Sequence, residues 1–387
     1  MGIERIGVVG AGVMGSEIAQ VAAAAGCSVV LVDVDDAAVT RGLTHVRSIG
    51  ERRVAKGRLT QDDADAIAGR VTGSVSLDAI GDCDLVIEAG PEVLELKRTL
   101  WQAIDAAAKP SALLASNTSG LSITTLARAT QRPERVMGLH FFNPASVMRL
   151  VEVIRGADTA EATIDAGARV AERLGKVPVR VLECPGFLVN RILVRALAEA
   201  YRHADELDAA RVPADQAVID AGPAPMGPFA LGDLIGLDTT LHVQRDLEVA
   251  YGERFAAGTS LAAEVDAGRL GRKSGAGLVT GSEPGAADGH GPAVAERYHL
   301  GAFDEACRCL EEGIATLPDI DLAMTLGTGW SEGPFAWAER RGLPELAADL
   351  AALAGLAGDR FAPRAPLTER IAAGTTFTHP TTENPTT

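Results

Sequence analysis

The chain has 387 residues, which is enough for two or three domains. Its apolar content of 47% is typical of globular proteins, and its aromatic content of only 4%, with abundant Ala and Gly, favours helix-rich packing over a β-sandwich. A formal net charge of −16 disfavours binding to nucleic acid or to anionic membranes. The five cysteines predict neither a disulfide framework nor a metal site. We detect no signal peptide and no apolar run of membrane-spanning length, so we expect a cytoplasmic protein.

The first part of the chain alternates apolar strands with helical stretches. Residues 3–9 predict a buried strand, residues 13–25 a helix, and residues 27–32 a second strand that ends at Asp33. Strand–helix–strand order of this length is typical of a parallel sheet. Further strands are predicted at 85–88, 113–116, 135–139, 150–153 and 177–181. We therefore expect an α/β fold, with a doubly wound Rossmann-type sheet over residues 1–184.

The remainder of the chain has a helical pattern with few strand signals. Pro185-Gly186 is a plausible boundary because both residue types interrupt regular structure. We expect an all-α domain at 185–280, a Gly/Pro-rich linker at 281–292, a second helical domain at 293–365, and a disordered Thr/Pro-rich tail at 375–387.

The two helical domains echo each other. Met226-Gly-Pro-Phe-Ala230, followed by Gly236-Leu237, recurs as Glu332-Gly-Pro-Phe-Ala336, followed by Gly342-Leu343. Chance similarity between Ala-rich helices is the alternative, but the shared tetrapeptide with matched spacing favours duplication. The second domain is therefore predicted to be a degenerate copy of the first.

A dinucleotide-binding motif follows the first strand. Gly10, Gly12 and Gly15 form a G-x-G-x-x-G turn, with Val13 and Met14 opening the next helix. The glycines allow a tight turn, close approach of the pyrophosphate, and close packing of helix on strand. The helix N-terminus offers free N–H groups to the phosphates.

Asp33 predicts which dinucleotide is bound. A carboxylate at the end of the second strand accepts both ribose hydroxyls of NAD and repels the 2′-phosphate of NADP. FAD uses the same glycine motif and is the alternative. The predicted cofactor is NAD.

A set of polar residues at strand ends suggests alcohol oxidation. Such a reaction needs a base for the hydroxyl proton, and histidine is the natural base near neutral pH. His140 follows an apolar strand, Glu152 lies within another, and Ser119 follows a third. Taken singly, these residues have ordinary explanations as a core histidine, an edge glutamate and a helix N-cap. Their shared position at strand ends, where such sheets bind ligands, favours a site in which Glu152 orients His140.

Five longer motifs resemble the L-3-hydroxyacyl-CoA dehydrogenase family, which includes 3-hydroxybutyryl-CoA dehydrogenases. The motifs are Ser116-Asn-Thr-Ser119, Gly138-Leu-His-Phe-Phe-Asn-Pro144, Leu150-Val-Glu-Val-Ile154, Pro185-Gly-Phe-Leu-Val-Asn-Arg191 and Met226-Gly-Pro-Phe229. The resemblance covers about residues 3–278. It implies that His140 is the catalytic base and Glu152 its orienting partner, and that Ser119 and Asn190 bind the substrate oxygens.

The resemblance also implies binding residues. Asn143, Glu92, Lys97 and Lys273 are similar to cofactor contacts of the family. A basic segment, in which Arg52, Arg53 and Lys56 stand out, corresponds to a helical hairpin that contacts CoA. Gly57 stands where a lysine is common in the family. The carrier of the substrate could therefore be CoA or the phosphopantetheine arm of an acyl carrier protein.

Three alternatives remain open from the sequence. The same carbonyl chemistry could serve polyketide extender-unit biosynthesis on an acyl carrier protein. A dehydrogenase of free hydroxy acids or sugar acids is a second enzyme alternative, and a non-catalytic NAD-binding protein is a third. For assembly, the family resemblance implies a homodimer through the helical domain, and the duplication allows a pseudo-dimeric monomer instead.

Overall fold

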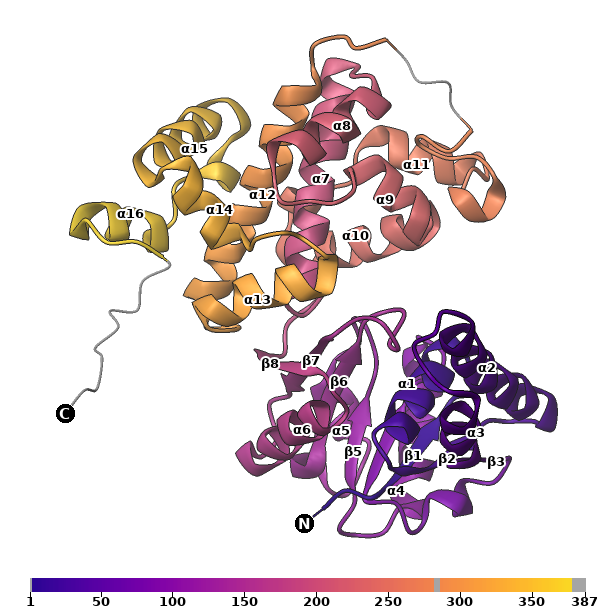
Figure 1. Cartoon of the computed structure of the whole chain (residues 1–387). Coiled ribbons are helices and arrows are strands. Elements are labelled where there is room, and N and C mark those ends of the chain that lie inside the picture. The colour runs from indigo at the N-terminus through magenta and orange to yellow at the C-terminus, as the bar shows by residue number, and fades with distance from the viewer. Residues whose placement is uncertain (1, 282–285, 378–387) are drawn as a thin grey trace. The chain divides into compact units, whose positions relative to one another are not determined.

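The computed structural model of the chain describes residues 2–281 and 286–377 (Figure 1). It divides between Cys184 and Pro185 into an N-terminal unit and a helical unit, which are described separately below. None of the helices within the described residues is long and apolar enough to cross a membrane.

An eight-stranded sheet forms the centre of the N-terminal unit, in the order β3-β2-β1-β4-β5-β6-β7-β8. The strands are β1 (Arg5–Val9), β2 (Ser28–Val32), β3 (Val71–Ser74), β4 (Leu85–Glu88), β5 (Leu113–Ser116), β6 (Val136–Phe141), β7 (Leu150–Arg155) and β8 (Val177–Leu182). Neighbouring strands are parallel except β6 and β7. Because β1 lies between β2 and β4, the direction of winding reverses there, and such a reversal creates a ligand crevice at the carboxyl ends of the strands. The predicted Rossmann-type sheet is confirmed.

The central strands are short apolar runs, as expected for strands covered on both faces. The connecting helices are α1 (Val13–Ala24), α2 (Asp36–Ala55), α3 (Gln61–Gly69), α4 (Leu94–Ala107), α5 (Ile123–Ala127) and α6 (Glu161–Arg173), with short 3₁₀ turns at Leu77–Ile80 and Pro133–Arg135. The strand predicted at 135–139 runs to Phe141, so His140 lies within a strand and not after it. Phe141 still pairs with Val151 of β7, and its N–H donates to the Asn117 Oδ1 at 2.8 Å.

The helical unit contains two copies of one helical arrangement (Figure 1). The first copy comprises α7 (Val189–Leu207), α8 (Arg211–Ala221), α9 (Pro228–Ile235), α10 (Leu237–Tyr251), η3 (Glu253–Phe255) and α11 (Thr259–Asp266), followed by η4 (Arg272–Ser274). The second comprises α12 (Gly291–Glu311), α13 (Leu317–Thr328), α14 (Pro334–Arg341), α15 (Leu343–Ala357), η5 (Asp359–Phe361) and α16 (Ala365–Ala373). The elements of the second copy follow those of the first in the same order, as expected for a duplication.

Equivalent side chains perform equivalent structural tasks in the two copies. Asp215 accepts hydrogen bonds from the Phe229 and Ala230 N–H groups at the start of α9. Asp321 does the same for the first turn of α14. The long helices α7 and α12 pack against each other, and a Cβ on Gly301 would lie 3.1 Å from Glu199 Cγ at their contact. A side chain at this position would require Glu199 to shift by a few tenths of an ångström.

Buried ion pairs join the two copies, and in each pair an arginine of one copy contacts a glutamate of the other. Arg191 of the first copy donates to Glu305 of the second at 2.7 Å, and the equivalent Arg297 lies 3.3 Å from the equivalent Glu199. In the same way η3 supplies an arginine to Glu305 and η5 supplies Arg360 to Glu199. Burial alone would raise the pKa of Glu305, but the neighbouring guanidiniums outweigh it and lower that pKa. This mutual exchange is the contact pattern of a two-fold interface.

Two predicted boundaries need correction. The second copy continues to Ala373, past the predicted end at 365, and its first helix already begins at Gly291, inside the predicted linker. Of the linker, residues 282–285 lie outside the described residues. Of the predicted disordered tail, 378–387 lie outside them too, but Phe377 is buried against the rings of Phe303 and Phe335. An aromatic anchor therefore orders the start of that segment.

Candidate active site

Close backbone approaches shape the glycine-rich turn between β1 and α1. Gly10 has a φ of +109°, and a Cβ there would lie 2.6 Å from the carbonyl oxygen of Ala89 at the end of β4. A Cβ on Gly15 would lie 1.8 Å from the Gly10 oxygen, so α1 packs directly on the turn. At Gly12 a Cβ would have no neighbour within 4 Å. The turn thus leaves space at the N-terminus of α1, which fits a pyrophosphate.

Asp33 ties the end of β2 to the same turn. Its Oδ2 accepts a hydrogen bond from the Ala11 N–H at 2.6 Å, and its Oδ1 accepts one from the Val34 N–H at 2.7 Å. The carboxylate therefore stands half-buried at the carboxyl end of the strand beside β1, where this fold binds the ribose of NAD. Together the turn and Asp33 fit the predicted cofactor.

A buried carboxylate at the end of β4, Glu88, organises the neighbouring strand ends. Its Oε1 receives the Lys97 Nζ and the Gly90 N–H, each at 2.6 Å. Its Oε2 receives the Ser116 hydroxyl at 2.7 Å and the Trp101 indole at 3.3 Å. Donors on both oxygens compensate the burial of this charge. Sequence reasoning missed Glu88, although a glutamate that ends an apolar strand was an available signal.

Glu92 connects this cluster to Ser119. Its Oε2 lies 3.3 Å from the Nζ of Lys97, and its Oε1 accepts a hydrogen bond from the Ser119 N–H at 3.0 Å. The Thr118 hydroxyl also donates to Glu92. The structure thus brings together Glu92, Lys97 and Ser119 beyond the ends of β4 and β5. Lys97 is 1% exposed, whereas its ion-pair partner Glu92 is exposed.

His140 and Glu152 form a buried pair across the antiparallel junction of β6 and β7. The two residues are directly opposite in the register, and the His140 Nδ1 lies 2.6 Å from the Glu152 Oε2. His140 is 6% exposed and Glu152 is fully buried. Asn143 follows on the exposed loop after β6. A carboxylate at this distance holds a proton on Nδ1 and stabilises the imidazolium that forms when the other nitrogen accepts a proton.

A cavity of about 370 Å³ borders the loop that follows Asn143. Basic side chains of α2 and the following turn line it together with residues of that loop: Arg52, Arg53, Lys56, Arg58, Pro144, Ser146 and Val147, with Glu17 and Ile49. The buried Glu17 accepts a hydrogen bond from the Ser146 N–H at 2.8 Å, which fixes the loop against α1. The predicted substrate-binding cations therefore lie beside the segment that connects the strands of His140 and Glu152.

Two predicted site residues belong to the helical unit. Asn190 lies half-buried in the first turn of α7. Lys273 is exposed in η4 and forms an ion pair with Asp238. The buried Asp233 fixes the turn after η4 by accepting hydrogen bonds from the N–H groups of residues 278–280.

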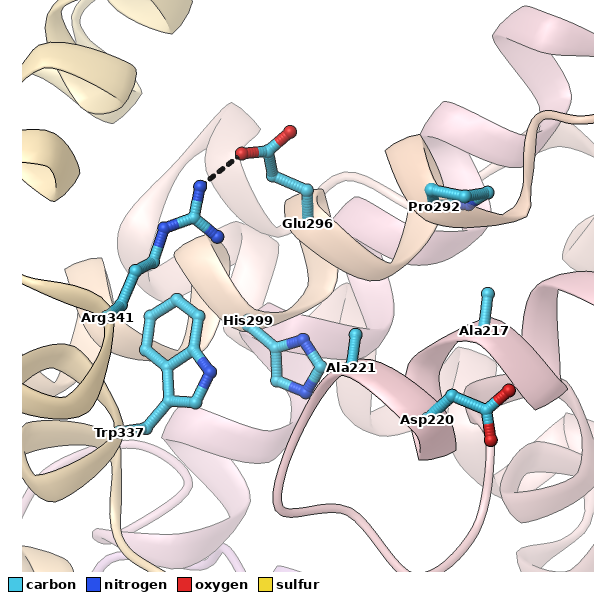
Figure 2. Close-up of a pocket in the computed structure, with 8 residues that line it drawn as sticks. All are labelled: Ala217, Asp220, Ala221, Pro292, Glu296, His299, Trp337 and Arg341. Carbon is cyan, nitrogen blue, oxygen red and sulfur yellow. Dashed lines mark hydrogen bonds and ion pairs between the residues drawn. The ribbon is translucent and has the colours of Figure 1, made fainter.

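A further cavity of about 460 Å³ lies in the helical unit (Figure 2). Its lining comes from α8, α12 and α14 and consists of Ala217, Asp220, Ala221, Pro292, Glu296, His299, Trp337 and Arg341. Figure 2 shows Glu296 turned toward Arg341, which donates to it at 2.6 Å. Aligning the copies places Glu296 opposite Asn190. The second copy therefore holds an ion-paired carboxylate where the first holds the predicted substrate-binding amide. The lining of this cavity includes none of the predicted site residues.

Comparisons with known proteins identify both units. Residues 5–184 match the family model "3-hydroxyacyl-CoA dehydrogenase, NAD binding domain". The model "3-hydroxyacyl-CoA dehydrogenase, C-terminal domain" matches residues 186–281 and again 294–384. The second match agrees with the duplication seen in the helices.

Individual relatives give the same result. A 3-hydroxybutyryl-CoA dehydrogenase of Bradyrhizobium diazoefficiens is 41% identical over 274 residues, covering 70% of this chain and 93% of that protein. The 3-hydroxyadipyl-CoA dehydrogenase of Escherichia coli K12 is 39% identical over 278 residues, which span 71% of this chain and 58% of the relative.

A solved structure extends the likeness over both helical copies. The crystal structure of 3-hydroxybutyryl-CoA dehydrogenase from Escherichia coli K12 is similar with a TM-score of 0.90 and 30% identity, covering 96% of this chain and 99% of that one. The chain therefore belongs to the 3-hydroxyacyl-CoA dehydrogenase family and is an NAD-dependent oxidoreductase.

Proposed function

We propose that the chain interconverts a 3-hydroxyacyl-CoA and its 3-oxoacyl form, with His140 as the base. The observation that carries the proposal is the buried His140–Glu152 pair at the carboxyl ends of an NAD-binding sheet. When bound, NAD⁺ supplies the acceptor for the hydride that leaves C3 of the substrate. The hydroxyl proton passes to the Nε2 of His140, and Glu152 stabilises the resulting imidazolium through Nδ1. The products are the 3-oxoacyl thioester, NADH and one proton.

The remaining roles proposed here are those that the resemblance to the family implies. Ser119 and Asn190 hydrogen-bond the substrate oxygens as the alcohol becomes a carbonyl. The turn at Gly10–Gly15, with Val13 and Met14, holds the pyrophosphate and Asp33 the ribose. Glu92, Asn143 and Lys273 contact the cofactor, and Lys97 acts through Glu92 because Lys97 is buried and paired with it.

The basic cavity supports CoA as the carrier. Arg52, Arg53 and Lys56 place several positive charges within one concave surface on a chain whose net charge is −16. CoA carries phosphates on its adenosine half, which such a surface attracts. An acyl carrier protein presents a phosphopantetheine arm with a single phosphodiester, so it uses fewer of these cations.

The test measures NADH consumption with acetoacetyl-CoA, with acetoacetyl-acyl carrier protein and with the free acid. We expect turnover with the CoA thioester to exceed turnover with either alternative. Turnover on the carrier protein alone would replace CoA as the carrier, and turnover on the free acid alone would remove the thioester from the proposal. NADH binding with no turnover on any of the three would leave only a binding protein.

We further propose that the helical unit is an internal dimer and that the protein is a monomer. The exchanged ion pairs of the two copies support this, because the second copy provides the contacts that a second subunit would provide to the first. Light scattering at several protein concentrations should give the 40.1 kDa of one chain throughout. A mass of two chains at all concentrations would favour the homodimer instead.

A further inference from the structure

The exchanged ion pairs of the helical unit are not equally tight on both sides. Arg191 binds Glu312 with two parallel hydrogen bonds, from Nη1 at 2.6 Å and from Nη2 at 2.7 Å. The equivalent Arg297 lies 3.6 Å from the equivalent Glu206 through a single nitrogen. Paired hydrogen bonds of this kind fix the plane of a guanidinium as well as its position. The second copy therefore holds Arg191 more precisely than the first copy holds Arg297.

Other contacts complete the enclosure of Arg191. Its side chain is fully buried, its Nε donates to Glu305 at 2.7 Å, and its guanidinium lies 4.2 Å from the centre of the Tyr251 ring. The Tyr251 hydroxyl donates to the carbonyl oxygen of Pro185 at 3.1 Å, at the start of the segment that leads into α7. The first turn of α7 is thus clamped from the second copy and from α10.

Asn190 precedes Arg191 in this same turn. Arg191, its neighbour in the chain, is held by Glu305 and Glu312, and both of these carboxylates belong to the second copy. At the position equivalent to this amide, the second copy has Glu296, which is bound to Arg341 (Figure 2). The second copy thus lacks the amide that is proposed to bind substrate, but it supplies the ion-pair partner of Arg191 in the first copy.

We propose that Glu312 of the second helical copy is a positioning residue for the reaction, which acts through Arg191 to fix Asn190. The inference rests on the proposed function, because Asn190 is assigned there to the substrate oxygens. It gives the second helical copy a task in the placement of Asn190, which belongs to the first copy. Catalysis depends steeply on such placement, since small displacements of a polar group cost large factors in rate.

The test compares Glu312→Gln with its internal counterpart Glu206→Gln. Both glutamates are 45% exposed and both face the equivalent arginine, so the two variants remove the same charge from the two sides of the pseudo-symmetric interface. We expect Glu312→Gln to lower kcat with acetoacetyl-CoA by roughly 10- to 100-fold. Glu206→Gln should leave kcat within about two-fold, and NADH affinity should be unchanged in both.

Coupling to Asn190 separates positioning from stability. If Glu312 acts through Asn190, then Glu312→Gln should have little further effect on kcat in an Asn190→Ala background. Independent, multiplying effects would overturn the proposal, and so would equal effects of the Glu312 and Glu206 variants. If Asn190→Ala alone keeps wild-type kcat, the role that the proposed function assigns to Asn190 is wrong, and the inference about Glu312 fails with it. That outcome differs from one in which Asn190→Ala lowers kcat but Glu312→Gln and Glu206→Gln have equal effects.

Discussion

His140 and Glu152 are directly opposite each other at the one antiparallel junction of the sheet, with Nδ1 and Oε2 2.6 Å apart. The pair does not depend on loop geometry, because both residues belong to strands and the register alone aligns them. Neighbours on the same face of an antiparallel pair are held within contact distance by the backbone ladder. The proposed base and its partner are thus positioned by two paired strands of the sheet.

Substitutions in this pair should affect the rate more than binding. We expect His140→Gln to lower kcat by roughly 10²- to 10⁴-fold, because general-base catalysis is lost. Glu152→Gln should lower kcat less, since it keeps the packing but weakens stabilisation of the imidazolium. NADH affinity, measured by fluorescence titration, should be unchanged in both variants. Wild-type kcat in His140→Gln would place the base elsewhere.

Two glycines of the cofactor turn should respond differently to a methyl group. A Cβ on Gly12 meets nothing within 4 Å, so Gly12→Ala should change stability by less than about 1 kcal/mol but weaken NADH binding. A Cβ on Gly15 lies 1.8 Å from a carbonyl oxygen, so Gly15→Ala should destabilise the fold by about 1–3 kcal/mol or more. Thermal unfolding and NADH titration of both variants check this. Equal loss of stability would contradict it.

The choice of dinucleotide should depend on Asp33. The double variant Asp33→Ser/Val34→Arg removes the carboxylate and adds a cation at a neighbour that is 87% exposed. A 2′-phosphate is then attracted where it was repelled, so the ratio of kcat/KM for NADPH to that for NADH should rise by at least about ten-fold. The single variant Val34→Arg serves as the control. An unchanged ratio in the double variant would remove Asp33 from the ribose site.

The basic cavity should matter only for substrates with a CoA nucleotide. We expect Arg52→Gln/Lys56→Gln to raise KM for acetoacetyl-CoA by about ten-fold at low salt, with kcat unchanged, because it removes binding that is equal in ground and transition states. Acetoacetyl-pantetheine, which lacks the phosphates, should keep its KM. Arg47→Gln, an exposed change on the same helix but outside the cavity, is the control. A parallel rise in KM for both substrates would argue against phosphate contacts.

His299 should make the helical unit sensitive to acid. Burial, together with Arg341 and Arg340, lowers the pKa of His299 to about 4. In the unfolded chain the imidazole titrates near 6.5, so the unfolded state gains protons first and stability is lost as the pH falls from about 6.5 to 4. His299→Leu removes this loss, which amounts to about 2–3 kcal/mol. Urea unfolding at pH 7 and pH 4.5 should show the variant losing less stability than the wild type over that interval. The same loss in both proteins would contradict the prediction.

Much of the N-terminal unit was predictable because local sequence patterns indicate where its strands and helices lie along the chain. Apolar runs separated by helical stretches predicted the sheet, and the glycine turn with Asp33 predicted the nucleotide crevice. The extent of β6 was not predictable to the residue, because Phe141 is held by its pairing with Val151 of β7 and by its hydrogen bond to Asn117, which are contacts with other segments of the chain. Glu88 was missed for a related reason: the donors that make its burial tolerable come from two other elements.

The helical unit was predictable in outline but not in its interior. The repeated Gly-Pro-Phe-Ala segments predicted the duplication. Arginines and glutamates of amphipathic helices, however, look like solvated surface in a sequence, and nothing local distinguishes Arg191 or Glu305 from such residues. Their burial follows only from the crossing of α7 and α12, which the two copies create together.

The close contact at Gly301 has a consequence for how the protein can change. In a symmetric homodimer every mutation appears on both sides of the axis, so a large residue at the crossing would meet its own image. Here the position equivalent to Gly301 is Arg195, which is fully buried and bound to Glu199 at 2.6 Å. Because both copies belong to one chain, a bulky Arg195 and a glycine, Gly301, can occupy equivalent positions on the two sides of the pseudo-two-fold axis. Each half can therefore acquire substitutions that the other could not tolerate.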